Sequence, residues 1–164
     1  MRPGLHVRVD NRLLHGQVVQ FWIPYLEVQR LLIADDETAQ SPAMSAVFRM
    51  AVPQRVDLEV VTISGLKEAL EKSTEASTMV LISDVFDLAR VIVCGIEIET
   101  VVLGNVHSTH GRERVTDSVY LSREELDALV RFTQRGGEVQ IQTFPGERMR
   151  LEVGPDGVVS WSKH

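Results

Sequence analysis

Short apolar runs alternate along this chain with longer segments of helical spacing, and this alternation limits the possible fold more than any other feature. Apolar runs of strand length lie at residues 5–9, 31–34, 56–63, 79–82, 100–103 and 138–144. Segments with helical spacing or capping follow the first five runs, at residues 16–26, 37–52, 64–73, 84–94 and 122–136. Runs that are apolar on both faces are typical of parallel strands covered by helices on both sides. We therefore expect an α/β fold with an open, mostly parallel, doubly wound sheet.

Capping residues and prolines predict where several of these helices begin and end. Ser122 and Glu125 have the spacing of a capping box, and Ser64 is placed to cap the helix that follows it. Pro42 suits the first turn of a helix, whereas Pro24 is expected to end or kink the segment that contains it.

The end of the chain departs from the strand–helix pattern. Residues 149–153 and 158–161 flank a turn at Gly154-Pro155-Asp156-Gly157, which suggests a C-terminal antiparallel hairpin. No linker rich in Pro, Gly or Ser divides the 164 residues. We expect residues 1–164 to form a single domain.

Charge and hydropathy exclude several classes of protein. A formal net charge of −6 argues against nucleic-acid binding, which draws its affinity from a basic face. No run approaches the ~20 apolar residues that a membrane-spanning helix needs, and residues 1–10 lack the apolar core of a secretory signal. The single Cys94 cannot form an intramolecular disulfide. We expect a cytoplasmic protein that does not span the membrane.

The familiar cofactor and hydrolase motifs are absent from the sequence. There is no G-x-G-x-x-G after the first strand, no G-x-x-x-x-G-K-[ST], no G-x-S-x-G and no H-E-x-x-H. His107 and His110 have a spacing that metal ligands can adopt, but no third ligand accompanies them, so a polar loop is the better interpretation. We expect no cofactor and no metal.

Ligands of open α/β sheets bind at the carboxyl ends of the strands, near a switch in strand order. The informative residues are therefore expected at 10–17, 35–37, 83–84 and 104–117, which follow predicted strands.

The first of these segments has the composition of a phosphoryl-accepting loop. His15 lies at a predicted helix N-terminus, where free backbone N–H groups favour an anion and disfavour an imidazolium, so we expect a neutral, nucleophilic ring. Gly16 leaves the backbone open to a tetrahedral group. Arg12 offers a guanidinium to phosphate oxygens, and Asp10 can hold the ring in one tautomer. The alternative is that Asp10 and Asn11 only form a turn and His15 only caps a helix.

Residues 7–18, VRVDNRLLHGQV, closely resemble the opening of the IIB subunits of the mannose/fructose/sorbose class of the bacterial phosphoenolpyruvate-dependent sugar phosphotransferase system. The similarity continues through residues 32–39, 103–107 and 118–122, and it covers residues 5–144. It implies an open, mostly parallel α/β sheet.

The resemblance also implies a function. His15 would receive a phosphoryl group from a phosphohistidine of the partner IIA domain and pass it to a sugar carried by the IIC and IID membrane subunits. Asp10, Arg12, Gly16 and Gln17 match the family's active-site loop position by position, whereas Asn11 stands where the family often has a second Asp.

Other residues have two interpretations each. Ser83 follows a strand and either donates to phosphate or caps a helix. His107 is a phosphate-binding candidate from a second loop, and Asn11 is one within the first. Arg8 shares a strand face with Asp10 and is expected to pair with it.

The apolar residues Leu13, Leu14 and Trp22 either form a docking patch for the IIA domain or belong to the core. Two other functions also remain open. One is a regulatory module that is phosphorylated at His15 without sugar transport. The other is a non-catalytic domain that binds phosphate or a sugar phosphate.

Overall fold

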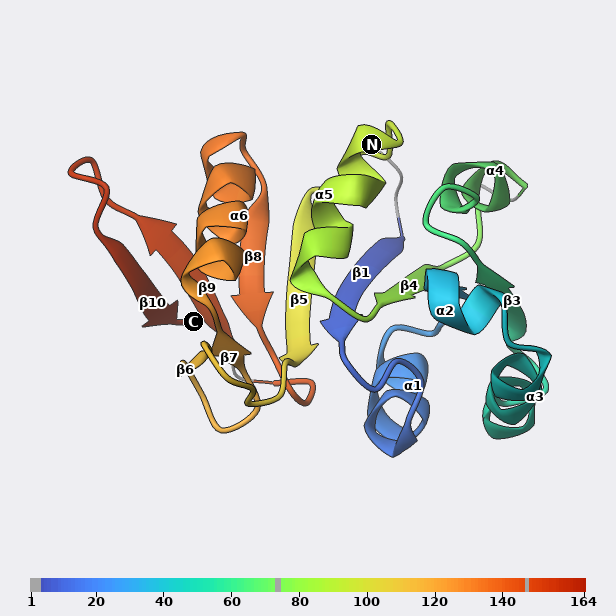
Figure 1. The fold of residues 1–164 in the computed structure, drawn as a ribbon. Coiled ribbons are helices and arrows are strands. Elements are labelled where there is room, and N and C mark those ends of the chain that lie inside the picture. Colours follow the sequence, from blue (N-terminus) through green and yellow to red (C-terminus); the bar gives the residue numbers. More distant parts are fainter. Residues whose placement is uncertain (1–3, 73–74, 147) are drawn as a thin grey trace.

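The computed structural model describes residues 4–72, 75–146 and 148–164, and Figure 1 shows one large twisted sheet flanked by helices. The strands are β1 (Leu5–Asp10), β2 (Arg30–Ala34), β3 (Asp57–Val61), β4 (Thr78–Ile82), β5 (Thr100–Asn105), β6 (Glu113–Arg114), β7 (Tyr120–Leu121), β8 (Glu138–Ile141), β9 (Met149–Val153) and β10 (Val159–Lys163). The helices are the π-helix η1 (Val18–Trp22) and the α-helices α1 (Ile23–Tyr25), α2 (Asp36–Ala39), α3 (Pro42–Ala51), α4 (Leu66–Glu71), α5 (Val85–Val93) and α6 (Arg123–Gln134).

The main sheet has eight strands in the order β10-β9-β8-β5-β1-β4-β2-β3. The six strands from β8 to β3 in that order are parallel, whereas β9 and β10 continue the sheet in antiparallel pairing. The short strands β6 and β7 form a separate antiparallel pair. The predicted fold class is confirmed, and so is the C-terminal hairpin.

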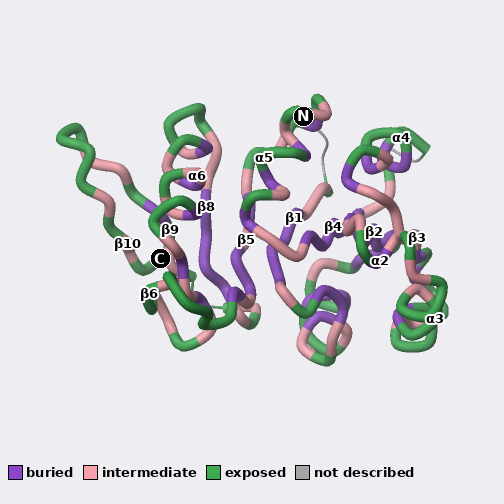
Figure 2. The backbone as a smooth tube through the Cα atoms, viewed as in Figure 1, coloured by how far each residue is buried: buried purple, intermediate pink, exposed green. Residues whose placement is uncertain are grey.

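Helices cover both faces of the sheet, because side chains of the central strands alternate between two apolar cores. In β2, Leu32 and Ala34 pack into the core under α4, α5 and α6, whereas Leu31 and Ile33 pack into the core under η1, α1 and α3. Figure 2 shows the central strands as the buried interior between exposed helical surfaces. None of the described helices combines the length and the apolar character needed to cross a membrane.

The chain leaves β1 on one face of the sheet and leaves β4 on the other. The helical segment after β1 packs on the face of η1 and α3, whereas α5, which follows β4, packs on the opposite face. Loops that diverge at neighbouring strand ends open a crevice between them, and the residues discussed below lie at this edge of the sheet.

The single helix predicted over residues 37–52 is wrong, because two helices occupy that segment. The Asp35 side chain caps α2 by accepting from Thr38 N, and the Ser41 side chain caps α3 by accepting from Met44 N. The second cap begins a new helix axis, and Pro42 occupies its first turn as predicted.

The predicted cap at Ser64 is also wrong. Gly65 is the N-cap residue of α4 and makes no side-chain capping bond, because Ser64 Oγ lies 3.2 Å from Thr62 Oγ1 instead. The predicted end of this helix, Ser73, lies outside the described residues. The capping box of Ser122 and Glu125 at α6 is confirmed.

Pro24 does not end the first helical segment. Ile23 N donates to Val18 O, an i to i+5 bond that closes the wide π turn immediately before the proline. Pro24 then falls in the first turn of α1, where a missing N–H is tolerated.

Candidate functional site

The loop after β1 is organised around one buried carboxylate. Asp10 is the last residue of β1 and has no exposed surface. Its Oδ1 accepts from Arg12 N at 3.0 Å, and its carbonyl accepts from Leu13 N at 2.9 Å. Leu13 has a φ of 56°, a strained conformation for a residue with a branched side chain. The loop is therefore held in a tight and specific turn.

His15 is held by that carboxylate. Its Nε2 lies 2.7 Å from Asp10 Oδ2, and the ring retains 13% of its exposure. An ionised carboxylate can only accept, so the shared proton is on Nε2 and the lone pair of the neutral ring is on Nδ1. The His15 carbonyl accepts from Val19 N at 3.1 Å, which places the ring at the start of the helical segment. Nδ1 is therefore the ring nitrogen that does not face Asp10.

A bulge in β5 brings a second hydrogen-bond donor to Asp10. The pairing of β1 with β5 shifts after Val9, which lies opposite Leu103, so that Asp10 lies opposite Asn105 and Gly104 is the extra residue. This shift lets Asn105 Nδ2 donate to Asp10 Oδ2 at 2.9 Å.

The pKa of Asp10 is lowered by its partners. Burial alone would raise it, but the hydrogen bonds from His15 and Asn105 and the nearby positive charge of Arg8 outweigh burial. Arg8 lies 3.4 Å from Asp10 Oδ2 through its Nε, which confirms the predicted pair. Asp10 is therefore an anion under physiological conditions.

Arg12 and Gln17 form the exposed rim of the loop. Arg12 Nη2 donates to Gln17 Oε1 at 3.1 Å, and half of the Arg12 side chain is exposed. A Cβ built on Gly16 would meet no other atom within 4 Å, so the backbone there is open to an approaching group. A guanidinium and open backbone thus lie in the same loop as His15.

Asn11 joins three strand ends. Its Nδ2 donates to Ser83 O at 2.6 Å, and its Oδ1 accepts from His107 N at 2.7 Å. The Ser83 hydroxyl donates to Asp35 Oδ1 at 2.9 Å, and Asp84, not Ser83, caps α5. Asn11 therefore fixes the relative positions of the loops after β1, β4 and β5.

A cleft of about 520 Å³ with both polar and apolar lining lies at this edge of the sheet. All four segments expected at strand ends contribute to it, through the residues Asn11, Arg12, Leu13, Asp35, Glu37, Ser83, Asp84, His107, Thr109 and Arg112. Ser83 and His107 thus lie in one cleft with Arg12, and their contact with phosphate stays a prediction.

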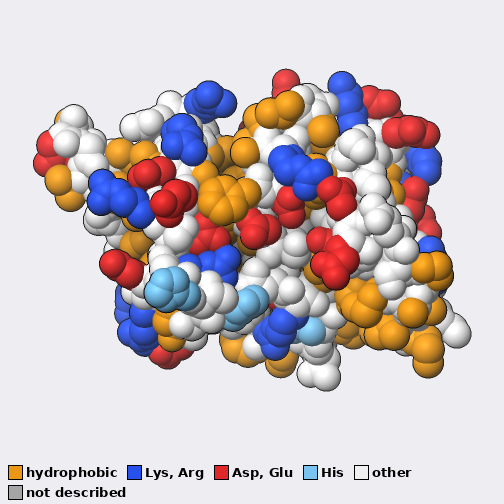
Figure 3. Space-filling model, in the orientation of Figure 1, with side chains coloured by type: hydrophobic (Ala, Val, Ile, Leu, Met, Phe, Trp, Pro, Cys, Tyr) orange, Lys and Arg blue, Asp and Glu red, His pale blue; other side chains and the backbone are white. Residues whose placement is uncertain are grey.

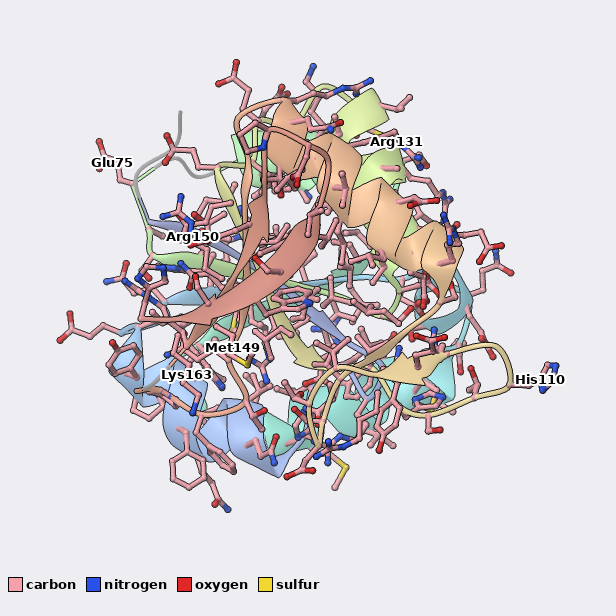
Figure 4. All side chains as sticks on the ribbon, turned by 90° about the vertical axis from the view of Figure 1, so that its left-hand side faces the viewer. Glu75, His110, Arg131, Met149, Arg150 and Lys163 are labelled. Carbon is pink, nitrogen blue, oxygen red and sulfur yellow. The ribbon has the colours of Figure 1, made fainter. Side chains whose placement is uncertain are left out.

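The long loop after β5 is anchored by an ion pair. Arg112 donates to both carboxylate oxygens of Glu125 at 2.6 and 3.0 Å and to the His107 carbonyl at 2.9 Å. His110 lies at the outer tip of this loop and points away from the protein (Figure 4). Within the described part of the chain, no group of three or more His, Cys, Asp or Glu side chains is placed to hold a metal ion.

The docking role considered for Leu13, Leu14 and Trp22 is wrong, because all three are buried in the core on the side of the sheet that carries η1. Trp22 instead donates through Nε1 to the Thr143 carbonyl at 2.9 Å. Sequence reasoning also missed Asn105 and Gly104 as site residues. Both lie within the expected segment 104–117 and the family-like stretch 103–107, but neither was singled out there.

The structure is thus an open, mostly parallel α/β sheet whose first strand-end loop carries a histidine on a buried carboxylate. The chain belongs to the family of the PTS system sorbose subfamily IIB component, whose family model matches residues 5–151. Members of this family are phosphotransferase components that take part in passing phosphoryl groups from IIA to sugar.

Individual relatives agree with this membership. The chain is 23% identical over 142 residues to the fructose-specific EIIB component of Bacillus subtilis, covering 85% of this chain and 87% of that one. It is 29% identical over 146 residues to the N-acetylgalactosamine-specific IIB component 1 of Escherichia coli, covering 88% and 92%. The crystal structure of manxB from Thermoanaerobacter tengcongensis matches with a TM-score of 0.80 and 30% identity, covering 89% and 91%.

Proposed function

We propose that His15 is the phosphoryl carrier of this IIB protein. Its Nδ1 attacks the phosphorus of a phosphohistidine on a IIA domain, the donor N–P bond breaks, and its electron pair returns to the donor ring. The phosphoryl group then passes from His15 to a sugar held by IIC and IID membrane subunits. The observation that supports this most is the hydrogen bond from His15 Nε2 to Asp10, which leaves Nδ1 free.

Asp10 is the group that stabilises the phosphorylated ring. When Nδ1 forms its bond to phosphorus, Nε2 keeps its proton and the imidazole ring becomes positively charged. The Asp10 carboxylate, 2.7 Å away, offsets that charge. Gly16, Asn11 and Gln17 belong to the loop that receives the phosphoryl oxygens.

We place the protein in the cytoplasm, where a IIA donor is available, and treat residues 1–164 as one IIB domain. Eight of the ten strands in the described part of the chain belong to a single sheet, which supports a single domain. The chain also matches 42% of the length of the mannose-specific EIIAB component of Escherichia coli, at 25% identity over 137 residues. The name EIIAB indicates that this relative carries an A component and a B component in one chain, which supports a IIA domain as the phosphoryl donor.

The direct test is phosphorylation in solution. The protein is incubated with phosphoenolpyruvate, the general phosphotransferase proteins and a IIA domain, and acid-labile phosphate is then measured. Label on Nδ1 of His15 supports the carrier function. Binding of phosphate without a covalent adduct would instead indicate a non-catalytic binding domain.

Arg12 supplies positive charge to the equatorial oxygens of the phosphoryl group in transit. We expect Arg12→Ala to slow phosphoryl uptake by roughly 10²-fold, because a charged donor aimed at a transition state contributes at that level. Rapid-quench measurement of label uptake checks the rate. An unchanged rate would give Arg12 a structural role, through its bond to Gln17.

The donor domain is expected to dock partly on α3. Figure 3 shows apolar side chains gathered at the lower right, over this helix. Met44, Val47 and Met50 are 45%, 56% and 88% exposed, and Met44 also lines the cleft beside Arg12. A IIA domain that brings its phosphohistidine to this edge therefore meets an apolar surface continuous with the cleft.

We expect Met50→Glu to raise the KM for phosphorylated IIA roughly tenfold while leaving kcat unchanged. Val93→Glu is the matched control, because Val93 is 86% exposed at the end of α5 far from the strand-end edge. Equal KM values for the two variants would show that the IIA domain does not dock on α3.

A further inference from the structure

A buried arginine lies directly beneath the histidine–carboxylate pair. Arg8, in the middle of β1, is 1% exposed. Its Nη1 donates to the Gln142 carbonyl at 2.8 Å, its Nη2 donates to the Thr143 carbonyl at 3.4 Å, and its guanidinium lies 4.8 Å from the centre of the Trp22 ring. An arginine is seldom buried to this degree unless a specific charge requires it.

The backbone around Arg8 is shaped to admit the guanidinium. A Cβ built on Gly104 would overlap the Nη2, Cζ and Nε atoms of Arg8. Gly104 is also the extra residue of the β5 bulge that places Asn105 beside Asp10. The same glycine thus makes room for the arginine and aligns a donor to the carboxylate.

The contact of Arg8 with Asp10 is one of charge. Arg8 Nε lies 3.4 Å from Asp10 Oδ2 but makes no hydrogen bond within the described residues. Burial lowers the pKa of Arg8 to about 10, which still leaves it cationic near neutral pH. Asp10 has no exposed surface, and the titratable and charged groups facing it are Arg8, Arg12 and His15. Arg8 is the buried one of the two arginines.

We propose that Arg8 is a positioning residue that keeps Asp10 ionised and thereby holds His15 in the tautomer with its proton on Nε2. Removing this cation leaves the hydrogen bonds from His15 and Asn105 to oppose burial, which shifts Asp10 toward its protonated form, whose O–H would donate to Nε2. The neutral ring would then keep its own proton on Nδ1, where phosphorus must bind. This inference rests on His15 being the carrier, but the tautomer itself does not depend on any transfer.

The test is the tautomer of His15 in the whole protein, measured by long-range ¹H–¹⁵N NMR with ¹⁵N-labelled histidine. The wild type is expected to show the Nε2–H form near neutral pH. Arg8→Gln and, independently, Gly104→Ala are expected to populate the Nδ1–H form. They are also expected to slow phosphoryl uptake by about 10–100-fold, the usual cost of losing a supporting residue. Arg8→Lys, which keeps the charge, is expected to restore the Nε2–H form.

Arg30→Gln is the matched control. Arg30 is also a buried arginine of the same sheet, 4% exposed, but it pairs with Glu59 on β3 and not with the site. Its loss is expected to lower stability without changing the His15 spectrum. The proposal is overturned if Gly104→Ala and folded Arg8→Gln keep the Nε2–H form, or if Arg30→Gln changes the tautomer as much. If the wild type takes up no label while Arg8→Gln still shifts the tautomer, the carrier function alone is rejected and the role of Arg8 stands.

Discussion

His15→Ala is expected to take up no acid-labile phosphate from a phosphorylated IIA domain. The variant lacks the nucleophile, and removing the nucleophile of a covalent catalyst elsewhere has cost about 10⁶-fold in rate. The fold should persist, because Asp10 keeps its hydrogen bonds from Asn105 Nδ2 and Arg12 N and the bond from Val19 N to the His15 carbonyl does not need the side chain. Uptake of radiolabelled phosphate, followed by mass spectrometry of the labelled peptide, measures the effect.

His110→Ala is the control for this experiment. His110 lies at the tip of the loop after β5 and points into solvent, so its removal should leave label uptake unchanged. Label that persists in His15→Ala at the wild-type rate would assign the phosphoryl group to another residue.

Asp10→Asn should impair both transfer and folding. A neutral amide cannot offset the charge that develops on the His15 ring, and it can donate to Nε2 and so favour the wrong tautomer. An equivalent change in another histidine–aspartate pair lowered kcat about 10⁴-fold, and we expect a loss of roughly 10²–10⁴-fold here. The free energy of unfolding is expected to fall by about 3–5 kcal/mol, because Arg8 remains buried without its counter-ion.

The pH dependence of this loss of stability gives a second check on the role of Asp10. Since the pKa of Asp10 is lower in the folded than in the unfolded protein, its contribution to stability is complete above the ordinary value of 3.8 and is lost as the pH falls through the folded pKa. Urea unfolding of wild type and Asp10→Asn should therefore differ most near neutral pH and converge in acid. Asp57→Asn, at a carboxylate with 78% exposure, should show little difference at any pH.

Much of the fold was predictable because local patterns and the sheet agree. The central strands are apolar on both faces, as parallel strands between two helical layers must be, and each followed its predicted run to within a few residues. The division of residues 37–52 into two helices was not predicted, because the apolar spacing continues across the boundary between α2 and α3. The signal was the Ser41-Pro42 pair, a cap followed by a first-turn proline, which marks a second helix start.

The edge of the sheet that holds the site was predictable from where the strands end, but the contacts within the site were predictable only between neighbours in sequence. Asp10 and His15 lie in one loop, so the chemistry of that loop could be inferred directly. Asn105 reaches Asp10 through a bulge that exists only in the paired strands, and Gln142 and Thr143 reach Arg8 across more than 130 positions of chain. Such contacts depend on the register of the sheet, which a single sequence does not specify.

The close fit of Gly104 against the Arg8 guanidinium has a consequence for how this protein can diverge. Any larger residue that arises first at position 104 meets an occupied space, so its cost depends on what stands at position 8. During evolution, replacement of Arg8 by a shorter residue is therefore expected to precede any substitution of Gly104. Among distant descendants, the two positions should change as a pair.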